Sequence, residues 1–206
     1  MKDFERRENG KLYIPANEDS TTNHWNVIRK ACKEFNDSNF WEDDSALKNL
    51  QNYFAQSYDD LVLTPPFYCD RGNYIYFGKH FYANTNLTIL DEAPVRFGDN
   101  VFIGPNVGIY TAGHPIDAEV RAQDLEYALP IIVGNDVWIG GGVQITPGIT
   151  VGDDVVIGAG AVITKDIPAH SIAAGVPCKV IRKITQKDRE YWQKEYHDYK
   201  ADSDIN

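Results

Sequence analysis

The residue best suited to acid–base chemistry is His114, in the segment Gly113-His114-Pro115. A neutral imidazole takes up a proton near neutral pH, so a histidine at the mouth of a site can act as a general base. His114 also opens a stretch of about twenty residues that interrupts a regular repeat, and long interruptions of this kind are often functional. We take His114 as the candidate base; the alternative is a loop histidine that only satisfies its own hydrogen bonds.

The other reactive side chains do not predict a second kind of site. Cys32, Cys69 and Cys178 form no C-x-x-C pair, which argues against a disulfide framework and a zinc cluster. Neither Cys69 nor Cys178 has a recognisable histidine partner, and both read as small buried residues. A catalytic zinc needs three protein ligands, whereas only His80 and His114 of the five histidines fall in the repeat region. We expect no metal.

The part of the chain that must position these candidates has a sequence repeat of six residues. Large aliphatic residues recur at Val133, Ile139, Ile145, Val151, Ile157 and Ile163, and glycine follows four of them, at Gly134, Gly140, Gly152 and Gly158. The same register holds at Phe97, Ile103 and Ile109, and it can be followed back to Phe77 with one slip of two residues. A second row lies two residues earlier: Val95, Val101, Val107, Ile131, Val137, Val143, Ile149 and Val155.

A period of six fits neither an amphipathic helix nor an ordinary strand, and it is typical of a parallel β-helix. The two rows would form inward-facing ladders, with glycine where the chain turns a corner without Cβ strain. About twelve hexapeptides make roughly four coils of three sides, a prism about 20 Å tall.

The predicted organisation has three parts. Residues 1–60 form a helical segment, with helices around 24–31 and 45–55. Residues 61–184 form the β-helix, from which residues 111–130 are extruded as a loop. Residues 185–206 form a terminal helix and tail, with Thr185 as N-cap because an acid follows three positions later. The fold class is therefore mainly β.

Composition excludes several partners. The net charge is −10 and the pI is about 4.9, which leaves no surplus of cations to neutralise nucleic-acid phosphates. No apolar run approaches the eighteen or so residues of a membrane span, and the charged N-terminus has no signal-peptide pattern. We expect a cytoplasmic protein that binds neither nucleic acid nor membrane.

Five motifs together resemble the maltose and galactoside O-acetyltransferases, which are hexapeptide-repeat acyltransferases with a left-handed parallel β-helix. They are Tyr68-Cys69-Asp70-Arg71-Gly72, Tyr82-Ala83-Asn84, Thr111-Ala112-Gly113-His114-Pro115, Val137-Trp138-Ile139-Gly140-Gly141 and Ala173-Ala174-Gly175-Val176-Pro177. The resemblance covers essentially the whole chain. It implies a homotrimer with active sites between neighbouring prisms, and acetyl-coenzyme A as co-substrate. It also implies direct transfer of the acetyl group to a sugar hydroxyl, with His114 as base.

The resemblance also implies acceptor-binding residues, namely Asp70, Asn84, Asp91, Glu92 and Glu126. Carboxylates and amides bind hydroxyl groups directionally. Each has a plainer alternative: Asp70 could shape a turn, Asn84 could stack inside a coil corner, and Glu126 could be a solvated loop acid or could orient His114.

For the coenzyme, the resemblance implies Trp138, Gly141, Ala159, Thr164, Lys165, Lys179 and Arg182. The last four surround the end of the repeat, and the cations among them suit the nucleotide phosphates. As alternatives, Trp138 could seal the trimer, and single lysines are often only solvated.

The chain departs from the galactoside enzymes at Pro15, where they carry an acidic sugar ligand. The acceptor therefore stays open between glucose, maltose, a galactoside and a non-sugar alcohol. The rival interpretations are a metal enzyme similar to the γ-class carbonic anhydrases and a non-catalytic β-helix scaffold.

Overall fold

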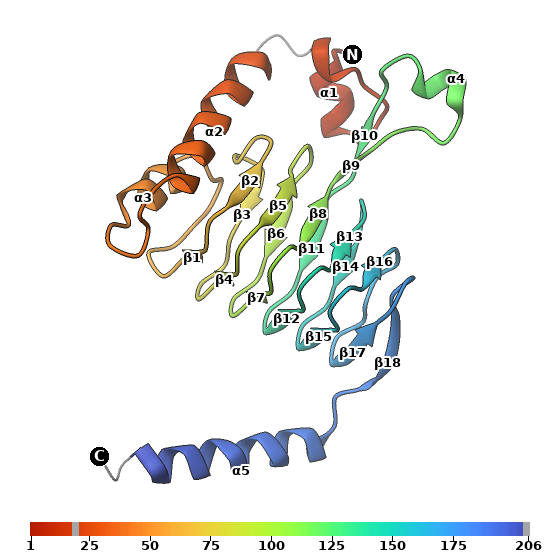
Figure 1. The fold of residues 1–206 in the computed structure, drawn as a ribbon. Helices are drawn as coiled ribbons and strands as arrows, with labels where there is room; N and C mark the ends of the chain where they lie inside the picture. Colours follow the sequence, from red (N-terminus) through yellow and green to blue (C-terminus); the bar gives the residue numbers. More distant parts are fainter. Residues whose placement is uncertain (18–20, 204–206) are drawn as a thin grey trace.

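The computed structural model describes residues 1–17 and 21–203, and its main body is a parallel β-helix (Figure 1). Helices α2 (Thr21–Asn36) and α3 (Ser45–Gln51) lie beside the first coils, and α5 (Gln186–Ser203) leaves the opposite end. Between the first helix, α1 (Asp3–Glu8), and α2 there is one 3-10 turn, η1 (Pro15–Asn17). None of the helices in this described part of the chain is long and apolar enough to cross a membrane.

The coils have three faces, which the chain visits in a fixed order. Face 1 contains β2 (Phe67–Cys69), β5 (Leu87–Leu90), β8 (Gly108–Tyr110), β13 (Gln144–Ile145) and β16 (Val162–Ile163). Face 2 contains β3 (Ile75–Tyr76), β6 (Val95–Phe97), β11 (Ile131–Val133) and β14 (Thr150–Val151). Face 3 contains β1 (Val62–Leu63), β4 (Tyr82–Ala83), β7 (Phe102–Ile103), β12 (Val137–Ile139), β15 (Val155–Ile157) and β17 (Ser171–Ala174), and the antiparallel β18 (Lys179–Lys183) closes it.

Both predicted aliphatic rows are confirmed as the core. Every residue of the two ladders is buried. Within face 3, for example, Ile139 pairs with Ile103 on one side and with Ile157 on the other. Because each coil places the same type of side chain at the same position on a face, apolar surface is buried continuously along the prism axis.

The prediction of roughly four coils is too low. Among the described residues, six of the seven strands on face 3 run parallel, which makes the stack about 24 Å tall at about 4.8 Å per step. The additional coil at the N-terminal end carries Leu63, Cys69 and Ile75 at six-residue spacing, all buried. A cysteine in the row and the absence of a following glycine hide this repeat in the sequence.

The expected reason for the corner glycines also needs correction. Gly140 does not have the positive φ that only glycine tolerates easily; a Cβ there would lie 2.7 Å from the backbone nitrogen of Ala159 in the next coil. The left-handed corner positions are instead filled by residues such as Asn86, Asn106 and Asp136. Glycine is therefore required because stacked backbones approach closely.

Helix α2 is held against the open end of the prism. From Trp25 onward, the buried side chains of α2 are Ile28, Ala31, Cys32 and Phe35. Asn36 is the last residue of α2. Its side-chain Nδ2 donates to the backbone carbonyl of Phe67 (3.0 Å), and its Oδ1 accepts from the backbone N–H of Phe67 (2.7 Å). This pairing satisfies the free edge of β2. Helix α3 ends at Gln51, earlier than the expected Ala55, because Phe54 turns inward to pack on Phe67 and Phe77.

The extruded loop has its own structure. Strands β9 (Ala112–Gly113) and β10 (Tyr127–Ala128) pair antiparallel at its base, and α4 (Ala118–Arg121) lies at its tip (Figure 1). Asp117 caps α4 by accepting from the N–H of Val120 at 3.0 Å. The loop therefore leaves the prism as a hairpin with His114 directly after its first strand.

The terminal helix begins as predicted, directly after Thr185. The Thr185 N–H and hydroxyl both donate to Asp188, at 2.8 and 2.7 Å. Arg182 also makes a bidentate pair with Asp188, so the helix start is tied to β18.

Candidate active site

A pocket of about 330 Å³ lies where α2, the turns after β2 and β5, and the base of the hairpin meet. Its polar and aromatic lining comes from four separate segments of the chain: Trp25, Arg29, Asp70, Glu92, His114 and Glu126. Four of the predicted site residues, Asp70, Glu92, Glu126 and His114, are therefore brought together.

His114 has one fixed nitrogen and one available nitrogen. Its Nδ1 lies 3.0 Å from the carbonyl oxygen of Leu125. Because a carbonyl oxygen can only accept, this bond places the proton on Nδ1 and leaves the lone pair on Nε2. The side chain is 53% exposed, and Nε2 lies 3.8 Å from Oε1 of Glu126. This is the arrangement that a general base needs.

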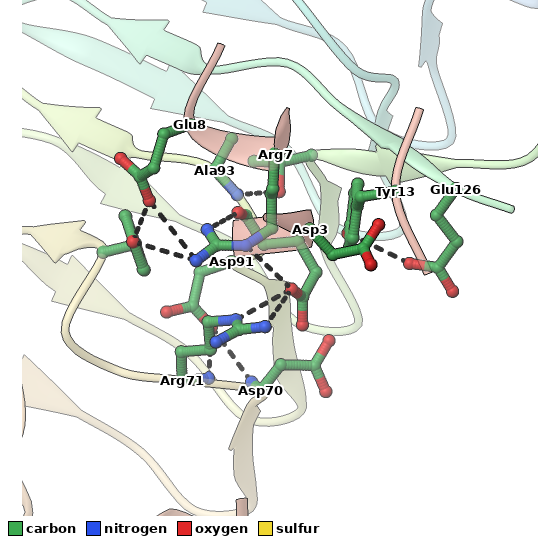
Figure 2. Close-up of polar contacts among 12 residues, drawn as sticks. Asp3, Arg7, Glu8, Tyr13, Asp70, Arg71, Asp91, Ala93 and Glu126 are labelled. Atoms are coloured by element: carbon green, nitrogen blue, oxygen red, sulfur yellow. Dashed lines mark hydrogen bonds and ion pairs between the residues drawn. The ribbon is translucent and has the colours of Figure 1, made fainter. Parts of the chain in front are cut away.

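Glu126 is itself held in place by Tyr13. The two backbones exchange hydrogen bonds in both directions, at 3.0 and 2.9 Å, and the Tyr13 hydroxyl donates to Oε2 of Glu126 at 3.1 Å (Figure 2). Burial and the negative charges of Glu92 and Glu126 raise the pKa of Tyr13, so its hydroxyl stays protonated as a donor. Tyr13, Glu126 and His114 thus form one chain of contacts leading to the pocket.

Beneath the pocket, Arg7 and Arg71, which are both labelled in Figure 2, form ion pairs with Glu92. Arg71 contacts Oε2 of Glu92 through Nε and Nη2, both at 2.7 Å, and Arg7 donates to the Glu92 carbonyl at 2.6 Å. Glu92 is only 4% exposed, and its carboxylate is paired with Arg71 although the residue still lines the pocket.

Asp91 lies deeper still and does not line the pocket. Its Oδ1 accepts the backbone N–H groups of Asp70 and Arg71, at 3.0 and 2.9 Å, and the side chain is fully buried. In this position Asp91 orients the turn that carries Asp70.

Asp70 lines the pocket, and the pKa of its carboxyl group is raised. Burial, followed by the charges of Glu92 and Asp91, raises its pKa to about 7, although Arg29 and Arg71 oppose the shift. Near neutral pH the carboxyl group is therefore present both protonated and ionised, and it can donate or accept a hydrogen bond.

Asn84 lies at a different edge of the prism. It follows β4 at the corner between faces 3 and 1, and its Oδ1 accepts the N–H of Thr85 at 2.7 Å. Gly141 and Ala159 follow β12 and β15 at this same corner, whereas His114 leaves the corner between faces 1 and 2. Within one chain, Asn84 is therefore separated from His114 by the width of face 1.

The remaining residues expected to bind coenzyme are spread over the exposed surface. Thr164 and Lys165 are exposed after β16, and Lys179 is exposed on β18. Trp138 points outward from face 3 and is 56% exposed, and with Arg182 it lines a second hollow of about 550 Å³ beneath α5. One chain does not gather these residues into a single site.

Some pocket residues escape the sequence pattern. Trp25 and Arg29, which line the pocket, lie on α2, outside the hexapeptide register. Tyr13, which holds Glu126 without lining the pocket itself, lies before α2 and outside the register as well. No three histidine, cysteine or acidic side chains in the described residues are placed to hold one metal ion.

Comparisons with known proteins match this architecture. The repeat residues 130–165 match the bacterial transferase hexapeptide model, and residues 94–117 match the model for the hexapeptide repeat of succinyl-transferase. Galactoside O-acetyltransferase of Escherichia coli is 46% identical, over 84% of this chain and 83% of its own length.

Two solved structures agree closely with the fold. A maltose O-acetyltransferase from Clostridium difficile 630 superposes with a TM-score of 0.86 at 42% identity, over 90% of this chain and 99% of its own. A galactoside acetyltransferase solved in complex with coenzyme A also gives 0.86 at 42% identity, over 92% and 94% of the two chains.

Proposed function

The chain belongs to the hexapeptide-repeat O-acetyltransferases, and we propose that it acetylates a sugar hydroxyl with His114 as the general base. It is an acyltransferase, and acetyl-coenzyme A is its co-substrate. The observation that carries the proposal is the geometry of His114, whose Nδ1 is held by the Leu125 carbonyl while Nε2 is left free at a polar pocket.

The proposed reaction is a direct transfer. The acceptor oxygen attacks the thioester carbonyl carbon as its proton moves to Nε2 of His114. When the tetrahedral intermediate collapses, the carbon–sulfur bond breaks and the thiolate of coenzyme A takes up the proton from the imidazolium. Glu126, 3.8 Å from Nε2, stabilises the positive charge that His114 carries between the two steps.

The acceptor side of the pocket fits a polyhydroxyl compound. Asp70 donates or accepts near neutral pH, and a buried group that needs a hydroxyl partner rejects acceptors that lack one. Asp91 acts through Asp70, and Glu92 is neutralised by Arg71. The two superposed relatives are named for different sugars, so we assign the class of acceptor and not a single sugar.

A homotrimer completes the proposed site. Asn84, Gly141 and Ala159 share one corner of the prism, and His114 leaves the neighbouring corner across face 1. A ternary complex needs all of them together, and threefold packing can bring one corner of a subunit against the other corner of its neighbour. Trp138, Thr164, Lys165, Lys179 and Arg182 would then contribute to coenzyme binding from the surfaces that meet.

Release of free thiol from acetyl-coenzyme A tests the proposal, with a panel of glucose, maltose, galactosides and non-sugar alcohols as acceptors. We expect thiol release to depend on a sugar and to yield an O-acetyl ester detectable by mass spectrometry. Turnover with non-sugar alcohols alone would contradict the proposed acceptor class.

A further inference from the structure

Helix α2 presents two side chains, Trp25 and Arg29, to the pocket that contains His114. They are four residues apart and therefore lie on one face of the helix. The adjoining face is buried through Ile28, Cys32 and Phe35, and Asn36 fixes the end of the helix to β2. The position of Trp25 at the pocket is thus set by the packing of a well-anchored helix.

The indole of Trp25 has no structural hydrogen bond. Its Nε1 is shielded from solvent and has no hydrogen-bond partner among the described residues. A shielded tryptophan N–H normally finds a partner, because leaving it unpaired costs about 1–3 kcal/mol. The ring lies instead near two guanidinium groups, with Arg71 at 5.8 Å and Arg29 at 5.9 Å from its centre. The indole therefore makes no hydrogen bond to a described residue, and what it offers to the pocket is its aromatic ring.

The rest of the pocket supplies the polar half of a sugar site. Asp70, His114 and Glu126 line the same volume as Trp25. A pyranose ring has apolar C–H faces and polar hydroxyl edges, so it needs both an aromatic surface and polar groups. A volume of about 330 Å³ is at the lower end for small-molecule sites, which suits a single ring.

We propose that Trp25 is the stacking platform for the acceptor and selects pyranose rings. One C–H face of the ring packs on the indole, and the ring hydroxyls reach Asp70 and Nε2 of His114. Further sugar units or an aglycone extend outside the pocket. This inference rests on the proposed function and adds the residue that determines its acceptor class.

Steady-state kinetics of Trp25→Leu and Trp25→Phe test the inference, with a methyl pyranoside and an open-chain polyol as acceptors. We expect Trp25→Leu to raise the KM for the pyranoside about 10-fold, equivalent to about 1.4 kcal/mol. Trp25→Phe, which keeps an aromatic face, should raise it only about threefold. The KM for acetyl-coenzyme A should stay unchanged, and the preference for the pyranoside over the polyol, measured as the ratio of their kcat/KM values, should fall in Trp25→Leu. Trp41→Leu, at an 81% exposed tryptophan outside the pocket, is the matched control.

A sugar titration provides a second readout if the leucine variant folds poorly. Adding the pyranoside should change the tryptophan fluorescence of the wild type and of Trp41→Leu, and the change should be lost in Trp25→Phe. A folded Trp25→Leu enzyme with an unchanged pyranoside KM would overturn the role of Trp25 while leaving the acetyltransferase proposal intact. A wild-type enzyme that acetylates no pyranoside would overturn both.

Discussion

At the scale of single residues, the candidate site is a chain of contacts that ends at Nε2 of His114. Tyr13 is buried and fixes Glu126 through its hydroxyl and through paired backbone hydrogen bonds. Glu126 approaches Nε2 of His114, and the Leu125 carbonyl next to it holds Nδ1. One short segment of the hairpin therefore sets both the tautomer of His114 and the charge beside its imidazole ring.

Glu126→Gln should lower kcat about 10-fold, because a carboxylate near 4 Å stabilises an imidazolium by about 1 kcal/mol or more in a partly exposed site. Tyr13→Phe should lower kcat less, since the backbone pairing that places Glu126 remains. Steady-state kinetics across pH measure both, and the KM for acetyl-coenzyme A is the internal control. Equal kcat values for Glu126→Gln and the wild type would remove Glu126 from the mechanism.

The ionisation of Asp70 makes the free energy of unfolding depend on pH. Its folded-state pKa of about 7 lies above the usual value of an aspartate, so folding favours the protonated form. The stability that it contributes is fully present below about pH 4 and is lost as pH rises through 7. Asp70→Asn should therefore gain stability relative to the wild type between pH 4 and pH 8.

Urea unfolding at several pH values measures this difference. Asp59→Asn, at an exposed acid, is the control and should show no such trend. A difference between Asp70→Asn and the wild type that stays constant with pH would show that Asp70 titrates normally.

At the scale of elements, the prism is held together by apolar ladders and by backbones that stack at close range. Gly140 is the clearest case, because a Cβ there would also lie 2.9 Å from the Cα of Ala159. Gly160, by contrast, has a φ of +71° and open space around it.

Gly140→Ala should lower the free energy of unfolding by about 1–3 kcal/mol, as overpacking does elsewhere. Gly160→Asn should be nearly neutral, since asparagine tolerates the left-handed conformation and already occupies corners such as Asn86 and Asn106. Urea denaturation compares the two variants. A larger loss of stability in Gly160→Asn than in Gly140→Ala would show that backbone conformation, and not the stacking distance, determines where glycine is needed.

The elements that could be predicted from the sequence are those with a local period. The two ladders, the loop that starts at His114 and the helix after Thr185 follow from spacing or from a cap motif within a few residues. The first coil cannot be recognised from the sequence because its row contains Cys69 and no glycine marks it. The places of Trp25 and Tyr13 depend on packing, which no local pattern shows: Tyr13 contacts Glu126, 113 residues away.

At the scale of the whole molecule, a single prism leaves much of its functional surface uncovered. Trp138 points away from the core, Ile116 at the hairpin tip is 97% exposed, and Trp192 on α5 is 68% exposed. In a trimer, neighbouring subunits would cover these exposed apolar groups. The same packing would bring Asn84 of one subunit close to His114 of the next.

We expect a trimer of about three times 23.2 kDa by sedimentation at the concentrations used for assays. Dilution or mild denaturant that separates the subunits should abolish activity before the β-sheet circular dichroism is lost. A fully active monomer would show that each site is complete within one chain.

The most direct test of the account is the turnover of His114→Ala together with its affinity for coenzyme A. Removing the proposed base should lower kcat about 10²- to 10⁴-fold, because general-base catalysis contributes about that much. Coenzyme A binding, measured by calorimetry, should stay close to that of the wild type, since the residues proposed to bind it lie elsewhere on the prism. A folded His114→Ala enzyme with near-normal turnover would contradict the assignment of His114 and, with it, the mechanism proposed for this pocket.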